Sequence, residues 1–208
     1  MKMSDGVDLR GFTALCVAGA LLAAAYATGC GPQRVSSSAY APQPEVERNS
    51  TKAEVLTRKA VERMDSAEAS ADEEAEAILR EALAADLYHG PAHNNLGVVY
   101  LRQGRLYEAA NEFEWARKLM PGNPDPRFNL ALTLERAGRT GEALAMYGTA
   151  LEVEEGHLPS MQALARLQVK GSRHDGRTDG LLREIALRGS SAEWRDWAQR
   201  ELVRRSNP

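Results

Sequence analysis

The sequence predicts an all-α protein, a solenoid of helical hairpins with additional C-terminal helices. Two observations lead to this prediction. The 208 residues are 43% apolar and 26% charged but only 6% aromatic, and this balance is typical of helices and gives little support to a β-sandwich or barrel. The sequence also matches itself when it is shifted by 34 places, a period typical of stacked hairpin repeats.

The first part of the chain reads as a targeting segment. No charged residue occurs from position 11 to position 33, and most of this stretch is apolar. A transmembrane helix and a secretory signal both fit its length, whereas a core helix that is apolar on every face is disfavoured by the Gly-Pro that follows. The shortage of bulky residues and the small residues at its end favour the signal.

The sequence Ala27-Thr28-Gly29-Cys30 resembles the bacterial lipobox, in which small residues precede a cysteine that becomes lipidated. The resemblance implies a signal peptide over 1–29 and an acylated Cys30 as the mature N-terminus. It implies a lipid-anchored protein that faces the periplasm of a bacterial envelope. Gly31, where an Asp would retain the protein in the inner membrane, favours the outer membrane. A transmembrane anchor at 11–29 and a simple cleaved signal stay open as alternatives.

Under this resemblance, residues 30–51 are expected to comprise the lipidated cysteine and a flexible tether. The segment 31–51 holds three Pro and four Ser with few apolar groups, so it cannot bury a core. A chain of this length spans roughly 25 Å. The folded part is therefore expected to hang near the membrane without lying on it.

Repeating helical patterns fill the rest of the chain. Residues 52–89 predict a degenerate hairpin, with helices at about 53–69 and 72–87. Two clear hairpins follow over 90–157. In the first of them apolar residues recur every three or four positions through 91–103 and again through 106–119, with Gly104 between them and Pro121 after them.

These two hairpins resemble the tetratricopeptide repeat (TPR). Segment 90–123 matches at Leu96, Gly97, Tyr100, Gly104, Ala109, Phe113, Ala116 and Pro121. Segment 124–157 matches at Leu130, Ala131, Leu134, Gly138, Ala143, Tyr147 and Ala150. The resemblance implies a TPR-type helical-hairpin solenoid that acts as a protein-interaction scaffold or assembly adaptor.

The C-terminal segment 158–205 predicts a partial repeat and capping helices. A first helix is expected at 159–170, and two more at about 179–188 and 192–205, the last with Ser191 as its N-cap. Trp194 and Trp197 are predicted to pack against the rest of the protein. An aromatic patch that faces a partner is the alternative.

In the resembling family, the first helix of each hairpin lines a concave groove that holds peptides or helices. Carried over by position, the groove residues of this chain are Asn94, Val98, Leu101, Arg102, Phe128, Asn129, Leu132, Glu135 and Arg136. Amides suit a peptide backbone, arginine suits a carboxylate, and the apolar residues suit an anchor side chain. The alternative is that these residues form an ordinary solvated surface.

The sequence predicts a protein that is not an enzyme and has no cofactor or metal site. His89 and His93 have the spacing of a zinc-binding helix, but Gly90-Pro91 between them would interrupt that helix. Cys16 and Cys30 are the only cysteines, which excludes disulfide frameworks beyond residue 30. An enzyme or regulatory subunit acting on envelope polymers remains the alternative function.

The net charge and its distribution along the chain indicate which classes of partner to expect. A net charge of −3 argues against nucleic acid as the main partner. Residues 52–87 carry five basic and ten acidic groups, whereas residues 166–205 carry ten basic and six acidic groups. Such polarity either orients another protein or lets copies of the chain associate end to end, so self-association is a further alternative.

Overall fold

A computed structural model describes residues 48–171 and 176–206 of the chain. Within these ranges it contains nine helices and no strand, which confirms the predicted all-α fold. The helices are α1 (Ser50–Met64), α2 (Ala71–Ala85), α3 (Gly90–Arg102), α4 (Leu106–Leu119), α5 (Asp125–Arg136), α6 (Thr140–Val153), α7 (Leu158–Lys170), α8 (Gly176–Arg188) and α9 (Ala192–Ser206).

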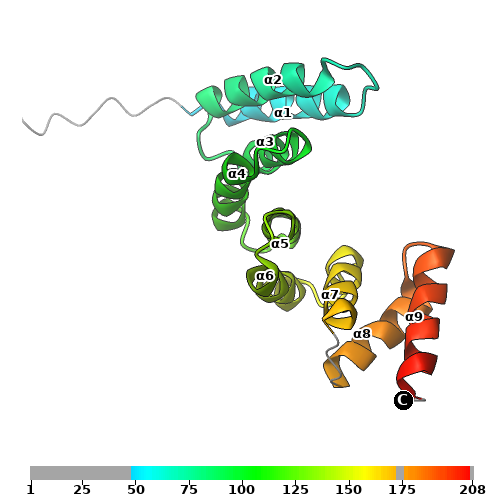
Figure 1. The fold of residues 1–208 in the computed structure, drawn as a ribbon. Helices are drawn as coiled ribbons and strands as arrows, with labels where there is room; N and C mark the ends of the chain where they lie inside the picture. Colours follow the sequence, from blue (N-terminus) through cyan, green and yellow to red (C-terminus); the bar gives the residue numbers. More distant parts are fainter. Residues whose placement is uncertain (1–47, 172–175, 207–208) are drawn as a thin grey trace, which may run out of the picture. The chain divides into compact units, whose positions relative to one another are not determined.

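Successive helices form antiparallel hairpins that stack in chain order, as Figure 1 shows. Helices α1 and α2, α3 and α4, and α5 and α6 are the hairpin pairs, and the second helix of each pair packs against the first helix of the next. First helices also contact one another, α1 with α3 and α3 with α5. The first helices therefore share one side of the stack. We call α3, α5 and α7 the A helices.

The 34-residue period continues further along the chain than the sequence pattern indicated. Helices α3, α7 and α9 begin at positions 90, 158 and 192, in step with this period, and α5 begins one residue late at 125. Helix α1 is the exception, because it begins at Ser50, inside the segment predicted to be a tether. The Asn49 side chain accepts a hydrogen bond from the Lys52 amide at 2.9 Å and fixes that start.

The core is built from small residues that alternate with one large residue on each second helix. The side chains that fill these positions on α2, α4 and α6 are all fully buried: Ala75, Leu79 and Ala82; Ala109, Phe113 and Ala116; Ala143, Tyr147 and Ala150. Alanine at two of every three positions lets the helices approach closely, and the large side chain fills the remaining gap.

Glycine is required at the turn inside each of the two clear hairpins. Gly104 and Gly138 have φ values of 76° and 77°, in the left-handed region. The amide of the next residue, Arg105 or Arg139, donates to the carbonyl of Tyr100 or Leu134 at 2.9 Å. This is the hydrogen-bond pattern of a glycine helix stop, and it sets the reversal from first to second helix.

A second, smaller core joins α7, α8 and α9. Its buried members include Met161, Leu182 and Ile185, and the half-buried rings of Trp194 and Trp197 pack against it. The two indoles lie edge to face, with centroids 5.3 Å apart. The sequence prediction that these tryptophans pack against the rest of the protein is confirmed.

The predicted leader (1–29), Cys30 and the tether up to residue 47 lie outside the described residues. Across 48–171 and 176–206, the search for a helix long and apolar enough to cross a bilayer finds none.

Candidate functional site

The side of the stack formed by the A helices carries most of the predicted groove residues. We define the A-helix face as Asn94, Val98 and Arg102 of α3, Asn129, Leu132 and Arg136 of α5, and Arg166 of α7. All seven side chains are exposed or partly exposed. Hydrogen bonds made by Asn129, Arg136 and Arg166 join each A helix to the A helix before it, so the face is a connected surface.

Amides form the first link, between α3 and α5. The Asn129 side chain donates a hydrogen bond from Nδ2 to Oδ1 of Asn94 at 3.1 Å. Nδ2 of Asn94 in turn donates to Oδ1 of Asn95 at 3.5 Å. An asparagine amide has two donor hydrogens and an acceptor oxygen. Each amide therefore keeps capacity for a peptide backbone after this link is made.

Two arginines form the second link. Arg102 donates from Nη1 to the Met64 carbonyl at 3.0 Å and to Asp72, and Arg136, one repeat later, donates from Nη1 to the Leu101 carbonyl at 3.1 Å. Each guanidinium thus donates to a carbonyl in the last turn of the preceding first helix, where the helix dipole favours a cation. The Leu101 carbonyl also accepts a hydrogen bond from the Gly104 amide at 3.2 Å. Sequence reasoning missed this structural role.

A third link joins α5, α6 and α7 through Glu135. Its carboxylate accepts hydrogen bonds from Arg166 Nη2 at 2.7 and 2.8 Å and from the Tyr147 hydroxyl at 3.1 Å. Burial raises the pKa of Tyr147, and the adjacent Glu135 carboxylate raises it further. The phenol therefore stays protonated and acts as a fixed donor to Glu135.

The apolar residues predicted to line the groove differ in exposure. Val98 and Leu132 are partly buried and pack against the main core at their inner sides. Phe128 is also partly buried, with its ring 5.8 Å from Tyr147 and 5.7 Å from His157. Leu101 is only 5% exposed, so its side chain belongs to the core and adds little to any surface.

At its C-terminal end the A-helix face leads into a pocket of about 390 Å³. Arg166 comes from α7, Glu193, Trp194, Trp197 and Arg200 come from α9, and Ser191 precedes α9. We call this the aromatic pocket. Arg200 has no hydrogen-bond or ion-pair partner among the described residues. Both tryptophans were visible in the sequence, but only the fold brings Arg166 beside them.

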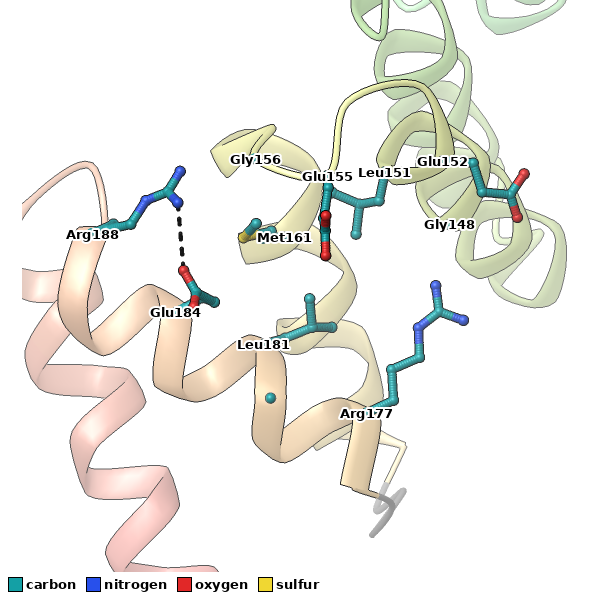
Figure 2. Close-up of a pocket in the computed structure, with 11 residues that line it drawn as sticks. Gly148, Leu151, Glu152, Glu155, Gly156, Met161, Arg177, Leu181, Glu184 and Arg188 are labelled. Carbon is teal, nitrogen blue, oxygen red and sulfur yellow. Dashed lines mark ion pairs between the residues drawn. The ribbon is translucent and has the colours of Figure 1, made fainter.

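A larger cleft of about 780 Å³ lies between α6, the start of α7 and α8 (Figure 2). Glycines 148, 156 and 180 contribute to its lining, together with charged and apolar side chains. Sequence analysis did not predict this cleft. The available signal was the unusual presence of Gly148 and Gly180 inside helical segments, where glycine is disfavoured.

The two histidines with metal-like spacing do not share a helical face. His89 precedes the first residue of α3, whereas His93 lies within that helix. His93 is 4% exposed, with its ring nitrogens 2.6 Å from Glu112 Oε2 and 2.9 Å from the Leu87 carbonyl. Within the described ranges, no group of three or more His, Cys, Asp or Glu side chains is arranged to hold a metal ion.

Comparisons with known proteins agree with this fold. The chain is 31% identical over 112 residues to a TPR repeat-containing protein of Pseudomonas aeruginosa, over 51% of this chain and 45% of that protein. It thus spans less than half the length of this relative. No model of a known protein family matches the chain.

Solved structures, two of them of TPR proteins, are similar to the chain at low sequence identity. A TPR protein from Parabacteroides merdae aligns with a TM-score of 0.61 and 21% identity, over 75% of this chain and 60% of that one. The first TPR of Spaghetti, solved bound to an HSP90 peptide, aligns with a TM-score of 0.56 and 19% identity, over 61% and 98%. MamA aligns with a TM-score of 0.53 and 17% identity, over 75% of this chain and 81% of that one. The fold is therefore a TPR-type helical solenoid.

Proposed function

We propose that this protein is a non-catalytic interaction scaffold that binds a peptide segment of another protein along the A-helix face. One observation carries the proposal. Hydrogen-bonded side chains connect α3, α5 and α7 into a continuous polar surface, and this surface ends beside a pocket with two tryptophans and an unpaired arginine. The similarity to the first TPR of Spaghetti, solved with a bound peptide, supports the same use of the fold here.

The chemistry of the surface indicates which peptide it suits. Asn94 and Asn129 hold amide groups at fixed positions, which favours hydrogen bonds to an extended backbone. The aromatic pocket suits a large apolar side chain, because tryptophan supplies much contact area at small entropic cost. Arg200 at its rim suits a carboxylate. The expected ligand therefore has a bulky apolar residue next to an acidic one.

A peptide-display selection against the purified full chain tests this proposal. We expect enriched peptides to share an apolar residue beside Asp or Glu, and their affinity to fall about tenfold or more in Arg200→Glu. Arg183→Glu is the matched control, because Arg183 is an exposed arginine of α8 outside both the A-helix face and the aromatic pocket. Equal losses in both variants, or no enrichment, would reject the proposed site.

We further propose that a lipid on Cys30 tethers the scaffold to a bacterial envelope membrane, with the solenoid facing the periplasm. The lipobox-like Ala27-Thr28-Gly29-Cys30 supports this, and the tether sequence after it supports a spaced attachment. Stable anchoring by lipid requires more than one acyl chain, which a fully modified N-terminal cysteine supplies.

Mass spectrometry of the native N-terminus tests the tether. An acyl mass on Cys30, and release of Cys30→Ser from the membrane fraction, are the expected results. Retention of residues 11–29 in the mature protein would favour a transmembrane anchor, and an unmodified N-terminus after cleavage would favour a secreted protein. Separation of the two membranes on a density gradient then checks the expected outer-membrane location.

A further inference from the structure

The cleft of Figure 2 is separate from the A-helix face, because second helices form its two long walls. Helix α6 contributes Gly148 and Glu152, and helix α8 contributes Arg177, Gly180 and other residues. The apolar part of the lining consists of Leu151, Met161 and Leu181. Its volume of about 780 Å³ has room for several large apolar side chains.

The cleft is open because glycine stands where side chains would otherwise fill it. A Cβ atom added at Gly180 would meet no atom within 4 Å, and one added at Gly148 would meet only Nη2 of Arg177, at 3.7 Å. Neither glycine has a positive φ, so backbone conformation does not require glycine at these positions. The missing side chains therefore leave space that a partner can occupy.

Opposite charges line the two walls. Glu152 and Glu155 stand on the side of α6, and α8 contributes Arg177 and Arg188 together with one acidic residue, Glu184, which leaves its wall net basic. In Figure 2, Arg177 extends from α8 toward α6. Among the described residues Arg177, Glu152 and Glu155 have no ion-pair or hydrogen-bond partner, and Arg188 has one ion pair, with Glu184 at 3.5 Å. These three unpaired side chains can therefore form ion pairs with an occupant that carries complementary charges.

We propose that this cleft binds an amphipathic helix of a partner protein, with basic residues along its edge facing α6 and acidic residues along its edge facing α8. Both walls are α-helices whose backbone groups are already bonded within the helix, so they offer no strand edge to an extended peptide. A helix satisfies its own backbone and places apolar side chains on the floor of Leu151, Met161 and Leu181. This second site goes beyond the peptide surface proposed for the A helices.

Synthetic helical peptides of equal length and equal apolar face test the inference against the full chain by fluorescence anisotropy. One peptide has Lys along one flank and Glu along the other, a second has Glu on both flanks, and a third has Lys on both. We expect the mixed-flank peptide to bind about tenfold more tightly than either uniform peptide, with the difference shrinking as salt is raised. The same mixed-flank sequence with a central proline, which prevents a helix, should bind poorly.

Two sets of variants locate the binding. Gly180→Trp fills the cleft and should abolish binding, whereas Gly180→Ala is the matched control and should bind as the natural chain does. Glu152→Lys combined with Glu155→Lys makes both walls basic and should move the preference to the peptide with Glu on both flanks. Arg200→Glu, in the aromatic pocket and outside the lining of the cleft, should leave this binding unchanged, which separates the result from that of the A-helix face.

Equal affinity for the three flank patterns, binding that survives Gly180→Trp, or a preference for the proline-containing peptide would each overturn the inference. A circular-dichroism spectrum unchanged by Gly180→Trp establishes that loss of binding reflects a filled cleft. If that variant fails to fold, the charge-reversed variant decides by itself, because it requires a switch of preference and not a loss.

Discussion

Gly97 is a position where one added methyl group is expected to destabilise the stack. A Cβ atom there would lie 2.6, 2.8 and 2.9 Å from Cε1, Cδ1 and Cζ of Phe113. Ordinary contact begins at 3.4 Å, so the ring has to move by about 0.8 Å. Phe113 is fully buried between the helices, as are its neighbours Ala109 and Ala116, and this leaves the ring little room to move.

The expected magnitude follows from two opposing effects. Overpacking of this kind costs about 1–3 kcal/mol. Replacing glycine by alanine inside a helix returns about 1 kcal/mol. We therefore expect Gly97→Ala to lower the free energy of unfolding by up to about 2 kcal/mol, whereas Gly180→Ala should raise it by about 1 kcal/mol. Gly180→Ala is the control, because it gains the same helix propensity in open space and should stabilise the protein.

Urea denaturation followed by circular dichroism measures the difference, and hydrogen exchange of α3 and α4 amides localises it, since stacked repeats do not always unfold in one step. Adding Phe113→Leu should partly rescue Gly97→Ala, because leucine lacks the ring atoms that clash. If Gly97→Ala proves as stabilising as Gly180→Ala, the close contact between α3 and α4 does not limit this site.

Three further predictions concern single side chains. His93→Phe keeps a ring of similar size but leaves two acceptors, the Glu112 carboxylate and the Leu87 carbonyl, unpaired, and should lower the free energy of unfolding by about 1.5–3 kcal/mol in the same urea assay. The Arg48 guanidinium holds the pKa of Asp86 at about 2, below its unfolded value, so the stability from this carboxylate is present above pH 4 and lost as pH falls toward 2. Asp86→Asn should therefore flatten the acid limb of a stability–pH curve; an unchanged limb would contradict this assignment. Gly138→Ala should cost about 1–2 kcal/mol because φ is 77°, and Gly138→Asn should cost less, as thermal unfolding will show.

The hairpins were predictable because the residues that pack them together lie a few positions apart in the sequence, and the same spacing recurs in each repeat. Spacings such as Ala109, Phe113 and Ala116 place one buried face on each second helix, and Gly104 marks the turn before it. The same reasoning placed the last helix at 192–205, and it runs from Ala192 to Ser206. The start of α8 was placed three residues late because the preceding polar loop hides it.

Much of the candidate site could not be predicted, because it depends on backbone groups and on empty space. Arg102 and Arg136 bind carbonyls 38 and 35 residues away, and a carbonyl has no signature in the sequence. Leu101 was assigned to the groove from its position in the repeat, yet the packing of neighbouring helices buries it. The cleft beside α8 arises where side chains are missing, and only the arrangement of helices shows that nothing else fills the gap.

The reach of Arg136 to Leu101 makes the order of synthesis matter. Helix α3 leaves the ribosome before Arg136 is synthesised. The Leu101 carbonyl therefore gains its hydrogen bond from Arg136 only after 35 more residues have been added. Arg102 completes α1 in the same backward direction. The last turn of each of these two first helices thus gains a hydrogen bond only after the next first helix has been made, and a chain truncated before Arg136 lacks the one at Leu101.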